Sequence, residues 1–143
     1  MMGQTAETLV RAPVSTGNIR TMDLRDLITP EGIIPALKVR TKKQALQELA
    51  DKAASLTGVN PRQIFESLLQ RERLGSTGVG RGIAIPHGKI DGLGKIVGLF
   101  AKLDHPVDFE AVDDQPVDLV FVLLAPTDAT AAHLKALAKV SRL

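Results

Sequence analysis

Apolar residues recur at helical spacing in a first segment that begins near residue 42. Small and aliphatic side chains fall three or four positions apart there: Ala45, Leu46, Leu49, Ala53 and Leu56. This interval places them on one face of an amphipathic helix. Thr41 and Gln44 precede them as a capping box, in which the Thr hydroxyl caps the helix and Gln44 reaches back. Gly58 ends the pattern.

A second helix is predicted from Asn60 to about Arg73. Asn60 is a favourable cap, Pro61 suits the first helical position, and Gly75 follows the end. Its buried face consists of apolar residues at helical spacing: Ile64, Phe65, Leu68 and Leu69. Two further helices are predicted near the ends of the chain, a short one over residues 23–28 that ends at Pro30 and Gly32, and a final one over residues 130–143.

Four apolar runs predict strands. Residues 96–103 and 117–125 are rich in β-branched residues, and the second run is nearly continuous, which favours a central strand. Residues 83–85 predict a short strand that ends at Pro86. Residues 33–39 contain Pro35 and can form at most an edge strand. Between the two long strands, an acidic loop is expected over residues 104–118. Helices and strands alternate in a mixed order, so the fold class is a layered α/β domain.

Composition narrows the functional classes. The chain has 143 residues, 18 Lys and Arg against 16 Asp and Glu, no cysteine, and four Phe with no Trp or Tyr. The absence of cysteine excludes disulfides, thiolate zinc sites and cysteine nucleophiles. A net charge of +2 and few aromatic side chains do not favour a nucleic-acid partner. Residues 1–21 are predicted to be a flexible tail. With no signal peptide and no apolar run of membrane-spanning length, we expect a cytoplasmic protein without direct membrane insertion.

The segment 75–82 holds four glycines in eight residues, which predicts a loop. Gly75 and Gly80 have the spacing of a phosphate-binding loop, but Arg81 and Gly82 follow where Lys and Ser or Thr are needed. The dinucleotide fingerprint fails as well, because Ile83 stands at its third glycine. An anion or nucleotide binder that uses this loop is nevertheless an open alternative.

His87 is the main candidate for chemistry. It follows Pro86 at the end of a predicted strand, and a neutral imidazole offers a nucleophilic nitrogen at pH 7. Five cations and only two carboxylates lie in residues 71–95, a balance that suits an anion. His133 lies on the apolar face of the final helix, as a core histidine or as a second imidazole that converges on His87. His105 is expected to be a solvated loop residue. No pair of histidines has metal-ligand spacing, so neither a metal site nor a cofactor is predicted.

Two segments, GSTGVGRGIAIPHGK and PVDFEAVDDQPVDLVFVLLAP, resemble the EIIA domain of the bacterial sugar phosphotransferase system (PTS). The similarity is to the fructose/mannitol type (type 2) and within it to the nitrogen-regulatory branch. It extends over residues 22–143. It implies a single layered domain with a mixed β-sheet flanked by helices, of the phosphotransferase/anion-transport-protein type. Family members continue past the position of Leu143, so we expect a truncated C-terminal end.

The resemblance also implies roles for individual residues. His87 matches the histidine that accepts a phosphoryl group, Arg71 the arginine that steadies this group, and His133 a second histidine beside the first. Phosphoryl transfer depends mainly on positioning and on electrostatic stabilisation of the equatorial oxygens. In this scheme, Ser76, Thr77 and Gly78 would supply donors to the remaining oxygens. The chain would then be a phosphotransferase component that forms a phosphohistidine intermediate, with a regulatory role.

The resemblance further implies partners. The donor would be a small HPr-like phosphocarrier, called NPr in this branch, and the targets would be regulators of potassium transport or of stress responses. An exposed apolar patch of Leu74, Val79, Ile83 and Ile85 is a candidate docking surface, although Ile83 and Ile85 are expected to belong to the core. The alternative function is the EIIA component of a fructose/mannitol-type sugar uptake system.

Overall fold

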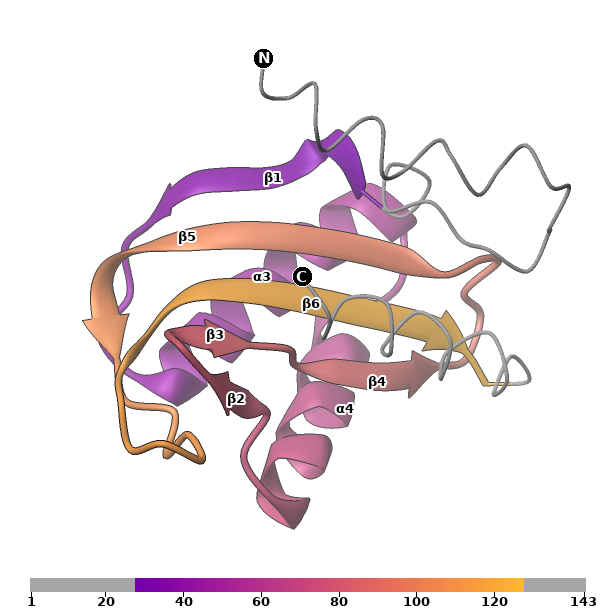
Figure 1. Ribbon diagram of the computed structural model, residues 1–143. Helices are drawn as coiled ribbons and strands as arrows, with labels where there is room; N and C mark the ends of the chain where they lie inside the picture. The colour runs from indigo at the N-terminus through magenta and orange to yellow at the C-terminus, as the bar shows by residue number, and fades with distance from the viewer. Residues whose placement is uncertain (1–27, 128–143) are drawn as a thin grey trace, which may run out of the picture.

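The computed structural model describes residues 28–127 (Figure 1). Six strands form one mixed sheet in the order β1-β5-β6-β3-β2, and β4 also pairs with β6. The strands are β1 (Ile28–Leu37), β2 (Gly78–Gly80), β3 (Ile83–Ala84), β4 (His87–Ile90), β5 (Val97–Val107) and β6 (Val117–Pro126). Two helices, α3 (Lys42–Thr57) and α4 (Pro61–Leu74), lie on the same face of this sheet (Figure 1). The predicted layered α/β fold with a mixed sheet is confirmed.

The capping signals of both helices are confirmed. The amide of Gln44 donates to Thr41 Oγ1 at 3.0 Å, and Gly58 ends α3 with a φ of 78°. The Gln44 side chain reaches back one residue further than a capping box requires, since Oε1 accepts from the amide of Arg40 at 2.7 Å. Asn60 Oδ1 caps α4 by accepting from the amide of Arg62 at 2.8 Å.

The core lies between the helices and the centre of the sheet. Apolar side chains of both helices and of the two long strands are fully buried there: Leu46, Leu49, Ile64, Leu99, Val120 and Val122. β6 is central as predicted, because it pairs with β5 on one side and with β3 and β4 on the other. Within residues 28–127, no helix is long and apolar enough to cross a membrane.

β1 is an edge strand, as Pro35 predicted, but it begins earlier than expected. It starts at Ile28 and runs through Pro30 and Gly32, where the sequence predicted the end of a helix. An edge strand tolerates a proline because one side of its backbone has no neighbouring strand. Its register with β5 is irregular between Ile28 and Ile33. Residues 23–27, the tail and the predicted final helix lie outside the described residues.

Further predictions about strands and loops are compared with the structure as follows. The strand of residues 83–85 ends before Pro86 as predicted, at Ala84, but a separate strand that was not predicted, β4, pairs with β6 from His87 onwards. The glycine-rich segment is not only a loop, because Gly78–Gly80 form β2 and pair with β3. The turn between these two strands has positive φ at both Arg81 (59°) and Gly82 (77°), as a tight hairpin requires. β5 also continues to Val107 and takes the first residues of the predicted acidic loop.

Candidate functional site

His87 is held at the point where the strand beside β6 is interrupted. Pro86 separates β3 from β4, and His87 is the first residue of β4. The half-buried imidazole places Nδ1 2.9 Å from the carbonyl oxygen of Ile85. A carbonyl oxygen can only accept a hydrogen bond, so Nδ1 carries the proton in this contact. Nε2 therefore keeps its lone pair and is the nucleophilic nitrogen of the ring.

Arg71 approaches His87 from the last turn of α4. Its Nε donates to His87 Nε2 at 3.1 Å, and its Nη1 donates to the carbonyl oxygen of Gly75 at 2.8 Å. The structure thus brings together two of the predicted site residues across 16 positions of the sequence. α4 can lie this close to β4 because Gly88 has no side chain, and a Cβ atom there would clash with Ser67 Oγ.

The surroundings of His87 favour its neutral form. Burial lowers the pKa of the imidazole below 6.5, and the positive charge of Arg71 lowers it further. The hydrogen bond to the Ile85 carbonyl and the negative charge of Glu72 raise the pKa, but the net direction is downward. At pH 7 the ring is therefore mostly neutral, which is the state in which Nε2 can attack an electrophile.

The three predicted phosphate-binding residues have hydrogen-bond partners within the protein. Thr77 is buried, and both its amide and its hydroxyl donate to the Glu72 carboxylate, at 2.9 and 2.6 Å. Ser76 Oγ donates to the carbonyl oxygen of Phe109 at 2.5 Å and accepts from the amide of Gly78 at 2.9 Å. These residues lie in the segment that follows Arg71, and their donors are engaged in holding that segment.

Sequence reasoning missed Glu72 as part of this site. Its carboxylate is buried and also accepts from Lys42 Nζ at 3.2 Å. A signal for it does exist in the sequence, because Glu72 continues the buried stripe of Ile64 and Leu68 at intervals of four residues. A carboxylate on the apolar face of a helix must be paired, and that requirement points to a structural or functional network.

Of the two other histidines, the structure describes only His105. His133 lies outside the described residues. His105 is exposed in β5, where its Nδ1 lies 3.6 Å from Asp104 Oδ2.

In the candidate docking patch, Leu74 and Val79 are 84% and 50% exposed, whereas Ile85 is buried. Ile83 is partly buried.

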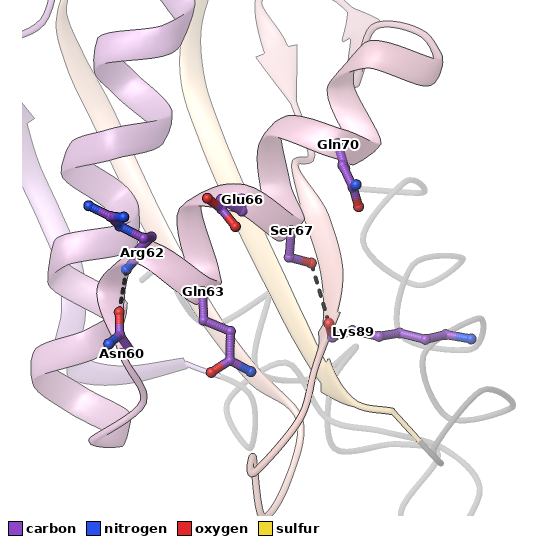
Figure 2. Close-up of a pocket in the computed structure, with 7 residues that line it drawn as sticks. All are labelled: Asn60, Arg62, Gln63, Glu66, Ser67, Gln70 and Lys89. Carbon is purple, nitrogen blue, oxygen red and sulfur yellow. Dashed lines mark hydrogen bonds between the residues drawn. The ribbon is translucent and has the colours of Figure 1, made fainter.

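A polar groove runs along α4 next to the Arg71–His87 pair. It is lined by Asn60, Arg62, Gln63, Glu66, Ser67, Gln70 and Lys89 (Figure 2). Ser67 Oγ donates to the carbonyl oxygen of Lys89 at 3.3 Å across this groove. Neither Arg71 nor His87 lines it, so we do not assign the groove to the phosphoryl-transfer chemistry. Within residues 28–127, no three His, Asp or Glu side chains form a group that could hold a metal ion.

Comparisons with known proteins show which family this chain resembles. Residues 26–143 match the family model described as phosphoenolpyruvate-dependent sugar phosphotransferase system, EIIA 2. A nitrogen regulatory protein of Bradyrhizobium diazoefficiens is 67% identical over 122 residues, which cover 85% of this chain and 80% of that protein. A PTS system fructose-specific EIIA component of Haloferax volcanii is 38% identical over 125 residues, which cover 85% and 81%.

A solved structure is similar as well. The crystal structure of nitrogen regulatory protein IIA-Ntr from Neisseria meningitidis superimposes with a TM-score of 0.77 at 37% sequence identity, and the match covers 81% of this chain and 80% of that one. The family model spans most of the sequence, including the helix, the strands and the histidine of the site. The chain belongs to the EIIA 2 family of the phosphoenolpyruvate-dependent sugar phosphotransferase system.

Proposed function

We propose that this protein is a phosphohistidine carrier and regulator of the nitrogen-related phosphotransferase system. His87 accepts a phosphoryl group from an HPr-like carrier of the NPr type, and the phosphorylation state is the signal. The observation that carries this proposal is the pair of contacts on the His87 ring. Nδ1 is bonded to a backbone carbonyl, and Nε2 faces the guanidinium of Arg71.

The transfer step follows from these two contacts. The Nε2 lone pair attacks phosphorus, the bond between phosphorus and the donor atom breaks, and the donor keeps that electron pair. Arg71 must first release Nε2, and its N–H groups are then free to bind the phosphoryl oxygens, for which the planar guanidinium is well suited. In the proposed scheme, the imidazole ring gains a positive charge on forming the N–P bond, and the hydrogen bond from Nδ1–H to the Ile85 carbonyl stabilises that charge while the proton stays on Nδ1.

Assignments for the remaining predicted residues belong to this proposal. His133 would be a second imidazole at the phosphoryl group. Ser76, Thr77 and Gly78 would contribute donors only after leaving their present acceptors, which are the Phe109 carbonyl, the Glu72 carboxylate and Ser76 Oγ. A phosphoryl group adds about 1.5–2 negative charges beside Arg71, enough to change which partner binds this surface. We propose that the partners are cytoplasmic regulators, such as those of potassium transport or stress responses.

The nitrogen-regulatory role is favoured over sugar uptake by the identities of the relatives. The relative named as a nitrogen regulatory protein is 67% identical, against 38% for the one named as a fructose-specific component. Nucleotide binding by the glycine-rich segment is not favoured. The amides of Thr77, Gly78 and Arg81 already donate to Glu72, Ser76 and Asp113.

The proposal is tested by intact mass after incubation with phosphoenolpyruvate and the upstream carrier proteins. We expect the wild type to gain one acid-labile phosphoryl group and His87→Ala to gain none. His105→Ala is the matched control, because it removes an exposed imidazole outside the site and should be phosphorylated like the wild type. A folded wild-type protein that stays unmodified with an active donor would refute phosphoryl acceptance.

A further inference from the structure

Glu72 is a buried carboxylate at the end of α4 with three hydrogen-bond donors. Its side chain is 3% exposed. Oε2 accepts from the amide of Thr77 at 2.9 Å and from Lys42 Nζ at 3.2 Å, and Oε1 accepts from Thr77 Oγ1 at 2.6 Å. Charge-assisted bonds of this kind are stronger than neutral ones. The carboxylate therefore fixes the position of Thr77 relative to the helix that carries Arg71.

Two further hydrogen bonds connect Thr77, through Ile85, to Nδ1 of His87. The carbonyl oxygen of Thr77 accepts from the amide of Ile85 at 2.9 Å. The carbonyl oxygen of Ile85 in turn accepts from His87 Nδ1 at 2.9 Å. The residue that Glu72 holds is thus bonded to the residue that orients the imidazole and sets its tautomer.

A second series of hydrogen bonds connects Gly75, through Arg71, to Nε2 of His87. Gly75 lies between Glu72 and Thr77, and its carbonyl oxygen accepts from Arg71 Nη1 at 2.8 Å while Arg71 Nε donates to His87 Nε2. Gly75 has φ 154° and ψ 152°, a conformation that essentially only glycine adopts. Such a flexible residue needs contacts on both sides to keep its carbonyl in place. On one side its own amide donates to the backbone carbonyl oxygen of residue 72 at 3.2 Å, and on the other side Thr77 is held by the Glu72 carboxylate.

We propose that Glu72 is a positioning residue for phosphoryl transfer, because it fixes the 75–77 segment on which the orientations of both His87 and Arg71 depend. It does not touch the reacting atoms. The inference rests on the proposed function for its kinetic test, and its geometric content is the orientation of His87 and Arg71. The negative charge of Glu72 also raises the pKa of His87, against the effects of burial and Arg71, so its removal has a second observable consequence.

The test compares Glu72→Gln with Glu48→Gln, an exposed carboxylate on α3. In Glu72→Gln we expect phosphorylation of His87 to slow by about tenfold to a hundredfold, the scale of a small misplacement of reacting groups. We also expect the imidazole pKa, measured by NMR titration of the ring protons, to fall. Glu48→Gln should match the wild type in both measurements. Urea unfolding confirms that each variant is folded.

Each outcome decides the inference. A folded Glu72→Gln protein with the wild-type rate and imidazole pKa would overturn it while the proposed function stands. If the wild type itself accepts no phosphoryl group, the proposed function fails and the inference fails with it, whereas a phosphorylated wild type beside an unslowed Glu72→Gln overturns the inference alone. If Glu72→Gln does not fold, Thr77→Val tests the same link, since it removes one donor and keeps the charge. Slower transfer in Thr77→Val supports the inference, and the wild-type rate overturns it.

Discussion

At the scale of single residues, the guanidinium of Arg71 donates a hydrogen bond to the lone pair of His87 Nε2, the nitrogen that is proposed to attack phosphorus. The Nε–Nε2 distance of 3.1 Å leaves no space for a phosphorus atom between the two groups. The incoming phosphoryl group must therefore displace this hydrogen bond. Arg71 can leave Nε2 and still remain close, because Nη1 is anchored separately on the carbonyl oxygen of Gly75.

Arg71→Lys tests whether this double contact matters. Lysine keeps the positive charge but is a point donor, so it cannot bind Gly75 and the phosphoryl oxygens as a planar fork does. We expect transfer from the carrier to His87 to slow by about a hundredfold, the usual cost of losing one preorganised donor. Rapid-quench measurement of phosphorylated protein gives the rate. Arg73→Lys, at an exposed position of the same helical turn, should be unaffected, and equal rates for both variants would contradict the clamp.

The sequence identified His87 and Arg71 but not the network that orients them. Both residues stand in a motif whose spacing resembles a known family, so their association could be predicted without coordinates. Glu72 stands beside Arg71 in sequence, yet its partners lie elsewhere, Lys42 in α3 and Thr77 in the loop before β2. Which buried carboxylate meets which donor depends on how α3, α4 and β2 pack, and no local pattern encodes that packing.

At the scale of elements, the helix caps and the positions of β6 and β1 in the sheet were predicted, whereas β4 was not. The helix caps at Thr41, Asn60 and Gly58 depend on hydrogen bonds within a few residues, and each was predicted. β4 was missed because residues 87–90 contain glycine and lysine and have little strand character of their own. It exists because β6, more than thirty residues later, offers a free edge to His87 through Ile90. Tertiary pairing here overrides local propensity.

Gly78 shows how tightly one such element is packed. A Cβ atom at Gly78 would lie 2.7 Å from the Cβ and 3.0 Å from the Cα of Ala111. Gly78→Ala must therefore push β2 away from the loop that follows β5. We expect the free energy of unfolding in urea to fall by about 1–3 kcal/mol, the range for overpacked sites.

The control for Gly78→Ala is Gly94→Ala. Gly94 has no atom within 4 Å of the added methyl and no positive φ, so stability should change by less than about 0.5 kcal/mol. Combining Gly78→Ala with Ala111→Gly removes the nearest clashing atom and should restore part of the loss. A Gly78→Ala protein as stable as the wild type would show that β2 can move without cost.

At the scale of the whole molecule, the site exists only where the two layers meet. The helical layer provides Arg71 and Glu72 at the end of α4, and the sheet provides His87 at the interruption between β3 and β4. The half-buried position of the imidazole in that junction is what lowers its pKa. Folding therefore moves a titratable group into a less polar environment, and His87 links the stability of the molecule to pH.

The direction in which His87 makes the free energy of unfolding change with pH can be predicted. The folded-state pKa of His87 lies below 6.5, the value expected in the unfolded chain, so between these two values the unfolded state binds more protons. The contribution of His87 to the free energy of unfolding therefore decreases as the pH falls below about 6.5, and it levels off below the folded-state pKa. We expect urea unfolding at pH 7.0, 6.0 and 5.0 to show His87→Gln gaining stability relative to the wild type as the pH falls. Parallel curves for His87→Gln and the wild type would show that folding does not perturb the imidazole.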